Sequence, residues 1–509
     1  LKSFWPVTHV QFFLAPIDMT LLGAVVLWIF QGFACGEVYT YPVKSINLDS
    51  AWTPTFFVSY GLEQLTPVAD FHPVHGIQTS DGGYVLTGKA LESESSLMME
   101  GFAAKLSSAG AVEWAWTTGA SGNDALNAVA ELPDGDLLLV GFRTLGGVAS
   151  RTLTKLSATG TAAAWTATFG DSSGKHGAWE MISITSNAVI LAGLKDKPSD
   201  EEMTFKSYGN AGEGKAVVMQ LPLSAVTGNT APTASSASWT KTFGDFMTAK
   251  AARALSNGNV ACLLWAEEQG ASAVMLSSAG DVIWGPTHHT TNHGEGTDLQ
   301  VPADQGSVLL FGHGPPAAGG QGYYGKLTKL STADGTAQWT KEFTAGGNPV
   351  LIYNECWGGV AVNDGSIVLA CGTGIEECDT KTGTDKTDCV SGLGDKRTGA
   401  IARAAGNWQS LVIRTDSSGD LIWQRVDSFR DSESPPLASS TAAHRTSSAA
   451  EWALQTSDGG LAVIMDEVNG IGLMKLAAPD GSSPSPSPSP SPSPSPSPSP
   501  SPSPSPSPS

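Results

Sequence analysis

The chain has 509 residues, and its 28 Lys and Arg against 48 Asp and Glu give a formal net charge of −20. Charged residues make up 15% of the chain, yet 15 Trp and 17 Phe are present. This composition excludes a disordered acidic chain, which lacks aromatic residues. It also excludes nucleic acid as an expected partner, because polyphosphate binding needs a basic surface.

Residues 1–36 are expected to be a leader that is removed from the mature protein. From Met19 the chain reads MTLLGAVVLWIFQGFACG, and the small residues Ala34 and Gly36 stand just before Glu37. An apolar run followed by this small-x-small pattern is typical of a secretory signal peptide. Residues 1–18 are interpreted as upstream read-through or as the rest of a longer leader, and residues 37–50 as an N-terminal segment.

The apolar run of the leader is shorter than the about 20 residues that span a membrane. We therefore expect a secreted, extracellular protein of the cell wall, matrix or cell surface, with no membrane span in the mature chain. An N-terminal anchor is the alternative.

An internal repeat runs through most of the chain and predicts its fold. Each copy begins with two apolar strands around a short turn, as in residues 76–89 and 125–143. A third strand ends in a segment such as KLSSAG (105–110) or KLSATG (155–160), and a fourth strand carries a Trp. Short strands joined by such turns are antiparallel, so each copy is a four-stranded unit. The seven turns lie at Asp81, Asp134, Asn187, Asn257, Asp304, Asp364 and Asp458.

The number of fourth strands predicts how the units are arranged. Six Trp-bearing strands follow the turns, and a seventh, AWTPTFFVSYG at 51–61, precedes the first turn. The N-terminal strand should therefore complete the last unit, which is built from residues near 451–477. Sheets that close into a ring have no long exposed edges.

We predict an all-β fold, a seven-bladed β-propeller of four-stranded antiparallel blades over residues 51–481. Residues 194–216 and 373–410 are expected to be insertions in the third and sixth blades. A Trp that recurs at one register of the repeat is expected in the core between neighbouring blades. These residues are Trp52, Trp114, Trp165, Trp239, Trp284, Trp339 and Trp423.

The repeat resembles that of secreted β-propeller proteins on bacterial and algal surfaces, over about residues 51–477. The resemblance lies in Asp81-Gly82-Gly83, Lys105-Leu106, Trp114, Thr118-Gly119 and Asp124, in this order. It implies the propeller fold and a role as a display or binding module. It implies no particular activity, since propellers also host unrelated enzymes.

From Ser483 the chain is a strict Ser-Pro alternation. Proline at every second position removes backbone donors and fixes φ, so residues 482–509 should form a polyproline II stalk on the order of 80 Å long. The run resembles the hydroxyproline-rich extracellular glycoproteins of green algae, and an unmodified linker is the alternative. The resemblance implies hydroxylation and O-glycosylation of Pro484, Pro486, Pro488, Pro490, Pro492, Pro494, Pro496, Pro498, Pro500, Pro502, Pro504, Pro506 and Pro508.

Four of the cysteines fall close together and are expected to form disulfides. Cys378 and Cys389 bracket a polar loop, whereas Cys356 and Cys371 flank a hairpin turn. Four cysteines allow three pairings, which the sequence does not separate. Cys262 lies in an apolar strand and is expected to be a buried free thiol. A zinc site is the less favoured alternative, because no C-x2-C pair is present.

Two loops and a set of acidic residues are candidates for ligand binding. The histidines of segment 287–293, with Glu295, could hold a transition metal, but ligands on one loop lack a rigid scaffold, and a polar connection is favoured. Segment 379–385 lacks the ligand spacing of a calcium loop. Acidic residues in the loops between blades could bind cations or sugars, although capping of their turns explains them better. They are Asp70, Asp124, Asp171, Asp245 and Asp298.

No H-E-x-x-H or P-loop motif is present in the sequence, and we expect no catalytic residues, metal or cofactor. The leader, the propeller and the tail together predict a non-catalytic extracellular structural or adhesive glycoprotein. Its expected partners are glycans or other extracellular matrix glycoproteins, with self-assembly into filaments as a further option. Two alternatives stay open: a propeller lectin that binds carbohydrate, and a secreted carbohydrate-active enzyme.

Overall fold

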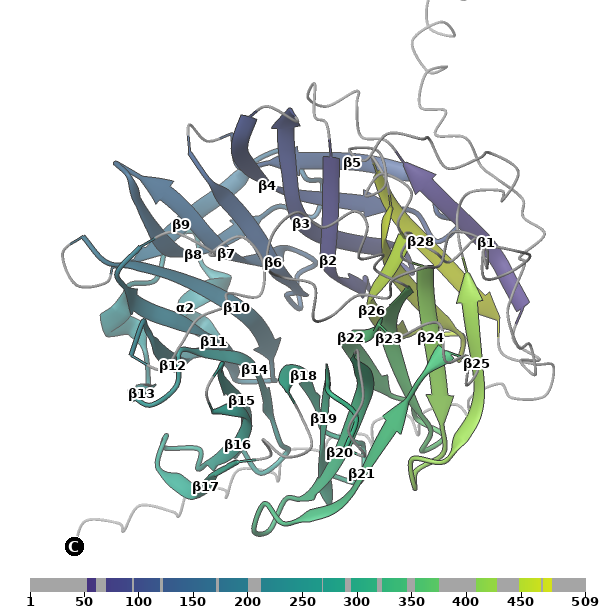
Figure 1. The fold of residues 1–509 in the computed structure, drawn as a ribbon. Coiled ribbons are helices and arrows are strands. Elements are labelled where there is room, and N and C mark those ends of the chain that lie inside the picture. Colours follow the sequence, from purple (N-terminus) through teal and green to yellow (C-terminus); the bar gives the residue numbers. More distant parts are fainter. Residues whose placement is uncertain are drawn as a thin grey trace, which may run out of the picture.

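A computed structural model shows a ring of seven four-stranded antiparallel sheets (Figure 1). It describes residues 53–60, 70–93, 96–119, 122–170, 174–199, 212–267, 269–288, 294–317, 323–345, 353–374, 409–427, 448–467 and 470–477. Each sheet is one blade, in which the chain runs from an inner strand through a second and a third strand to an outer strand.

The blades follow one another in chain order. Blade 1 comprises β2 (Asp70–Gln78), β3 (Tyr84–Ser93), β4 (Ser96–Leu106) and β5 (Val112–Thr117); blade 2 comprises β6 (Asp124–Glu131), β7 (Leu137–Leu145), β8 (Val148–Leu156) and β9 (Ala163–Phe169). Blade 3 comprises β10 (His176–Ile184), β11 (Ala188–Lys197), β12 (Lys215–Pro222) and β13 (Trp239–Phe243), with α2 (Ser224–Thr227) and the 3-10 helix η1 (Ala234–Ser236) before its outer strand.

Blade 4 comprises β14 (Thr248–Ala254), β15 (Val260–Ala266), β16 (Gly270–Leu276) and β17 (Val282–His288). Blade 5 comprises β18 (Glu295–Gln300), β19 (Ser307–Gly314), β20 (Tyr324–Ser331) and β21 (Ala337–Phe343). Blade 6 comprises β22 (Tyr353–Ala361), β23 (Ile367–Gly374), β24 (Gln409–Thr415) and β25 (Leu421–Asp427).

Blade 7 combines the two ends of the described chain. Its first three strands are β26 (Ser448–Gln455), β27 (Leu461–Glu467) and β28 (Gly470–Ala477), and its outer strand is β1 (Thr53–Tyr60). β1 lies beside β28 and pairs with it antiparallel along its length (Figure 1). The hydroxyl of Thr55 also donates to the carbonyl oxygen of Lys475 at 3.3 Å. The predicted seven-bladed ring, closed by an N-terminal strand, is confirmed.

The turn between the inner and second strands is held by an ion pair with the third strand. In blade 7, Nζ of Lys475 lies 2.8 Å from Oδ1 of Asp458. Gly459 adopts a φ of 83°, a conformation that favours glycine. A Cβ on Gly460 would lie 2.2 Å from Nζ of Lys475, so the second glycine leaves room for the lysine. Equivalent pairs are Lys105–Asp81, Lys155–Asp134 and Arg414–Asp364.

The Trp of an outer strand packs against the next blade, at the turn between its third and outer strands. Nε1 of Trp284 donates to the carbonyl oxygen of Thr332 at 2.8 Å, and a Cβ on Gly335 would lie 2.6 Å from the indole ring. Three other Trp residues make the same bond: Trp114 to Ala158, Trp165 to Gly228 and Trp239 to Ser278. The predicted position between blades is confirmed for these residues.

The prediction that the Trp series lies in the core is confirmed only in part, because not all of these side chains are fully buried. Trp165 and Trp423 are buried. The others in the described chain are half-buried, because the outer strand forms the rim of the ring: Trp114, Trp239, Trp284 and Trp339. Trp52 lies outside the described residues.

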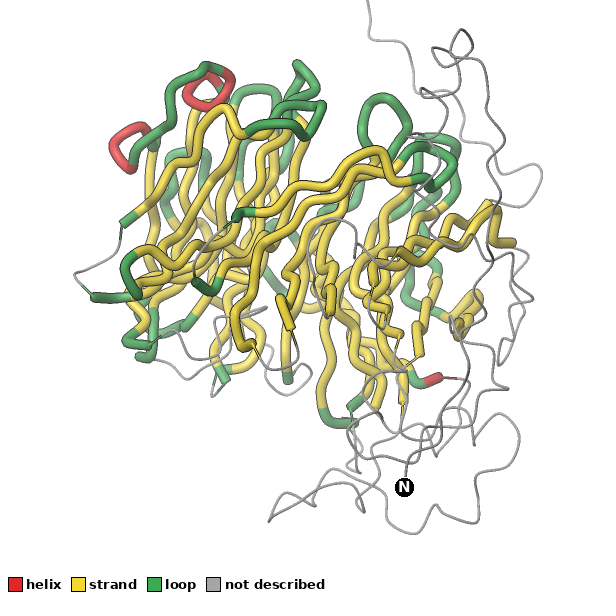
Figure 2. The backbone as a smooth tube through the Cα atoms, turned by 90° about the horizontal axis from the view of Figure 1, so that it is seen from above, coloured by secondary structure: helices red, strands yellow, loops and turns green. Residues whose placement is uncertain are grey.

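Buried apolar side chains fill the spaces between neighbouring blades. One continuous cluster includes Tyr84 of blade 1, Leu330 of blade 5 and Ile464 of blade 7. Figure 2 shows the strands running between two layers of loops and turns. No helix in the described ranges is long and apolar enough to cross a membrane.

Candidate functional site: a charged cluster on the inner strands

Every inner strand has a one-residue irregularity at an equivalent place in its pairing with the second strand. A β-bulge of this kind leaves one residue unpaired and redirects its side chain. Because the inner strands surround the centre of the ring (Figure 1), the unpaired positions encircle it, and we call them the bulge ring. They are Val74, Asn127, Glu180, Lys250, Thr297, Trp357 and Glu451.

Polar members of the bulge ring bind the next blade. Nδ2 of Asn127 donates to the carbonyl oxygen of Trp179, and Oγ1 of Thr297 donates to that of Cys356, both at 2.9 Å. In each case the acceptor is the residue just before the bulge of the neighbouring inner strand. The bulge thus provides a hydrogen bond that a buried polar side chain requires, and the bond joins two blades.

Lys250 places a buried amine in the bulge ring. Its side chain is almost completely buried, with Nζ 3.7 Å from Oε1 of Glu295 in blade 5 and 4.9 Å from the ring centroid of Trp265. Burial lowers the pKa of the Lys250 ammonium group, and the charges of Glu295 and Glu180 oppose this effect. The carboxylates and the aromatic face therefore offset part of the cost of burying the cation.

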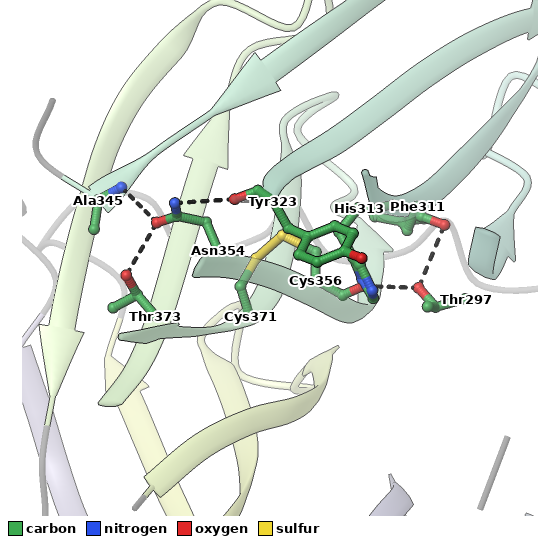
Figure 3. The surroundings of a disulfide bond; sticks show 9 residues. All are labelled: Thr297, Phe311, His313, Tyr323, Ala345, Asn354, Cys356, Cys371 and Thr373. Atoms are coloured by element: carbon green, nitrogen blue, oxygen red, sulfur yellow. Dashed lines mark hydrogen bonds between the residues drawn. A yellow bond between two sulfur atoms is a disulfide. The ribbon is translucent and has the colours of Figure 1, made fainter. Parts of the chain in front are cut away.

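Glu295 also contacts His313, its direct partner on β19. Nε2 of His313 lies 3.2 Å from Oε2 of Glu295, and Nδ1 lies 3.3 Å from the carbonyl oxygen of Cys356 (Figure 3). A carbonyl and an ionised carboxylate only accept hydrogen bonds, so both ring nitrogens carry a proton. Burial lowers the pKa of His313, but the hydrogen bond and charge of Glu295, the charge of Glu355 and the Cys356 carbonyl together raise it above its ordinary value.

We call Glu180, Lys250, Glu295, His313 and Glu355 the axial charge cluster; it extends from blade 3 to blade 6. Two of its members, Lys250 and His313, have shifted pKa values, and such groups gathered in one place mark a candidate functional site. The cluster can hold charge inside the ring. In the described ranges, no group of three or more His, Cys, Asp or Glu is arranged to hold a metal ion.

Of this cluster, only Glu295 was predicted from the sequence. It was predicted as a metal ligand beside the histidines of segment 287–293. The structure instead directs Glu295 to Lys250 and His313. Nδ1 of His288 lies 2.9 Å from Oγ of Ser272. His289 and His293 lie outside the described residues, as does segment 379–385. A lysine flanked by alanines on a predicted inner strand was the available signal for Lys250.

A disulfide joins Cys356 and Cys371 across the inner and second strands of blade 6 (Figure 3). Both cysteines are buried, and a Cβ on Gly325 of blade 5 would lie 2.5 Å from Sγ of Cys356. The disulfide therefore packs in the seam between blades 5 and 6. It selects one of the pairings that the sequence leaves open, whereas Cys378 and Cys389 lie outside the described residues.

Cys262 is a free and buried thiol, as predicted, and burial raises its pKa. Such a thiol is inert, because the reactive species is the thiolate. The expected glycosylation sites, Pro484 to Pro508, lie outside the described residues.

Three of the acidic residues expected in loops, Asp70, Asp124 and Asp298, lie in strands, so that expectation is wrong for them. Asp124 is fully buried on β6 and pairs with Nε of Arg143 at 3.1 Å. Burial raises the pKa of Asp124, and hydrogen bonds together with Arg143 oppose the rise. Asp298 is fully buried on β18 and pairs with Nη2 of Arg253 at 3.2 Å. Asp245 is an exposed turn residue, and the side chains of Asp70 and Asp171 lie outside the described part.

Segment 170–174, GDSSG, matches the G-x-S-x-G pattern of α/β-hydrolases. That pattern requires a sharp turn from a strand into a helix. Here the segment connects the outer strand β9 of blade 2 to the inner strand β10 of blade 3. The match therefore lacks the structural context of a nucleophile elbow.

No protein-family model matches the chain, and no curated protein matches it. Among solved structures, the WD40 domain of Toxoplasma gondii coronin is 8% identical, with 88% of this chain and 90% of that chain covered and a TM-score of 0.43. Sqt1 from Chaetomium thermophilum is 10% identical, with 81% and 97% covered and a TM-score of 0.42. A europium-containing methanol dehydrogenase is 9% identical, with 78% and 80% covered and a TM-score of 0.41. The propeller assignment rests on the strand pairing described above.

Proposed function

We propose that the protein is a non-catalytic extracellular structural or adhesive glycoprotein, in which the propeller is a rigid head on an O-glycosylated Ser-Pro rod. The observation that carries the proposal is the Ser-Pro run from Ser483 onward, which closely follows the last propeller strand. Alternating proline prevents helix and sheet and leaves extended polyproline II. Such a rod holds the head at a distance from the structure in which the tail is embedded.

Two observations support secretion. Disulfides form in oxidising compartments and are rare in the cytosol, and Cys356 and Cys371 are paired in blade 6. Residues 19–36 have the pattern of a signal peptide. In this proposal the prolines from Pro484 to Pro508 are hydroxylated and carry glycans that keep the rod extended. The head binds glycans, other matrix glycoproteins or further copies of the protein in a filament.

Glycopeptide mass spectrometry of the native protein tests this proposal. We expect peptides from residues 482–509 to contain glycosylated hydroxyproline. The intact mass should then exceed that of the unmodified mature chain. Unmodified proline throughout the tail would reduce it to a plain linker and remove the main reason for a place in the cell wall or matrix.

Binding measurements on the purified glycoprotein distinguish its possible partners. We expect association with matrix glycoproteins or with itself, measured by light scattering and by retention on immobilised matrix. Selective binding to one glycan on an array would instead favour the lectin. Turnover of a polysaccharide would favour the carbohydrate-active enzyme.

A further inference from the structure

We propose that His313 makes the seam between blades 5 and 6 sensitive to pH: the seam is tight while the imidazole is protonated and loosens when the ring loses a proton. This inference does not depend on the proposed function. It rests on the surroundings of one buried side chain and on the two acceptors that face its nitrogens.

The groups around His313 come from the inner strands β14, β18 and β22 and from the residue just before β20. β18 contributes Glu295, which in turn contacts Lys250 of β14. β22 contributes the carbonyl of Cys356, the charge of Glu355 and the ring of Trp357 at 4.9 Å. The ring of Tyr323, just before β20, lies edge-on at 5.8 Å. His313 itself is 4% exposed, so water does not replace a lost contact.

Only one of the two hydrogen bonds of His313 crosses the seam. Nε2 binds Glu295 within blade 5, whereas Nδ1 binds the carbonyl of Cys356 in blade 6. A neutral imidazole keeps one proton, and the bond to a carboxylate is roughly twice as strong as the bond to a carbonyl. The remaining proton therefore stays on Nε2. The lone pair of Nδ1 then faces the carbonyl oxygen of Cys356, and of the two bonds to this carbonyl across the seam only that from Thr297 remains.

Two other buried histidines in the described ranges have the opposite arrangement. The backbone N–H of Val129 donates to Nδ1 of His75 at 3.3 Å, and that of Ala149 donates to Nδ1 of His176 at 3.0 Å. In both, Nδ1 therefore faces a backbone donor, whereas Nδ1 of His313 faces a backbone acceptor. The two acceptors around His313 thus distinguish it from the other two buried histidines.

The direction of the pH effect follows from the raised pKa of His313. A histidine whose pKa is higher in the folded than in the unfolded chain stabilises the fold fully below the unfolded pKa of about 6.5. That stabilisation is lost as the pH rises through the higher, folded value. We therefore expect the seam to be tight in mildly acidic solution and weaker in alkaline solution.

Urea unfolding of the full chain between about pH 5.5 and pH 9 tests this with the variant His313→Gln, which cannot titrate. The matched control is His176→Gln, another buried histidine. In the wild type and the control, the folding equilibrium constant should fall by up to about tenfold per pH unit above pH 6.5. In His313→Gln this fall should be absent. A variant that keeps the wild-type pH dependence would overturn the proposal.

A second variant, Glu355→Gln, keeps His313 and both of its acceptors and removes one nearby charge. NMR of the 15N-labelled imidazole should show a titration midpoint above 6.5 in the wild type and a lower midpoint in this variant. A wild-type midpoint at or below 6.5 would contradict the proposal, even if His313→Gln fails to fold.

Reduction of the Cys356–Cys371 disulfide by a phosphine reports on the seam itself. Because the phosphine itself is more reactive at higher pH, the wild type is compared with His313→Gln. Thiol alkylation should show a larger increase in reduction rate from pH 6 to pH 8.5 in the wild type than in the variant, because the seam opens more often. An equal increase in both would show that protonation of His313 does not control the seam.

Discussion

The DGG and KL motifs of the repeat meet in one contact, in which the second glycine of DGG leaves room for the lysine of KL. A Cβ on Gly460 would lie 2.2 Å from Nζ of Lys475 and 2.4 Å from the carbonyl oxygen of Leu476. In blade 1, a Cβ on Gly83 would lie 2.0 Å from Nζ of Lys105. A side chain at the second glycine would displace the lysine from its aspartate unless it binds the lysine itself. The two motifs therefore occur together although they are more than a dozen residues apart.

In two blades where the second glycine is replaced, the new side chain binds the cation itself. In blade 2 the position is Asp136, whose Oδ2 lies 3.0 Å from Nζ of Lys155. In blade 6 it is Ser366, whose hydroxyl accepts from Nε of Arg414 at 2.9 Å. A polar side chain is thus tolerated at this position when it is itself a ligand of the base.

The substitution Gly460→Ala tests this contact. Its methyl group occupies the place of the Lys475 ammonium group, so we expect a loss of about 1–3 kcal/mol in the free energy of unfolding, as for other overpacked sites. The control is Gly244→Ala, where a Cβ meets nothing within 4 Å. It should change stability by less than about 0.5 kcal/mol in urea unfolding. Equal effects of the two substitutions would mean that the lysine moves aside at no cost.

The outer strands, like the polar bulge residues of the inner strands, connect one blade with the next. Trp284 on β17 reaches the turn of blade 5 both by its ring and by the bond from Nε1 to Thr332. Its neighbour Val282 is 40% exposed. Val282 and Trp284 share a strand, and of the two only Trp284 contributes to the contact between blades 4 and 5.

Trp284→Phe should therefore destabilise the protein by about 1 kcal/mol, because the aromatic ring stays and one hydrogen bond is lost. Trp284→Ala should cost about 3 kcal/mol or more, because the packing against Gly335 is lost as well. Val282→Ala, the control, should stay within about 0.5 kcal/mol of the wild type. Thermal unfolding by circular dichroism measures all three. An equal effect of Phe and Ala would assign the whole contribution to the hydrogen bond.

The strands themselves could be predicted, because their limits depend on local chemistry. Turns with Gly after Asp or Asn, such as Asp81-Gly82 and Asp458-Gly459, require positive φ and mark the hairpins. Apolar residues before and after each turn then indicate paired strands. For this reason the blade count and the closure by an N-terminal strand agree with the structure. Most of the predicted insertions 194–216 and 373–410 lies outside the described residues.

The axial charge cluster could not be predicted in this way. A one-residue bulge changes the side of the strand to which a residue points, and no residue type in the repeat marks it: the position holds Val74, Lys250 or Trp357. The carboxylate that Lys250 contacts and the carbonyl of Cys356 that His313 contacts each lie on the next blade, so their proximity is a property of the ring. The half-burial of Trp284 could not be predicted either, because the alternation of residues along a strand does not show how far that strand lies from the rim of the ring.

The whole molecule depends on the pairing of β1 with β28, since this is the only blade assembled from distant parts of the described chain. Removal of β1 would leave the third strand of blade 7 as an exposed edge. A variant that lacks residues 51–60 should therefore aggregate or melt far below the full protein in a thermal scan with light scattering. A variant that lacks only residues 1–50 is the control and should keep the melting temperature. If both variants melt like the intact chain, the ring does not need its closing strand.

The same closure sets the order in which the molecule can be completed during synthesis. Thr55 and Lys475 are 420 positions apart, so the first strand leaves the ribosome long before its partner is made. Blades 1 to 6 are each complete from consecutive strands and can form while the chain is still growing. β1 must wait unpaired until β28 appears. A chain that stops short of residue 470 would therefore expose two unpaired strand edges at once, which is the state that chaperones would have to protect from aggregation.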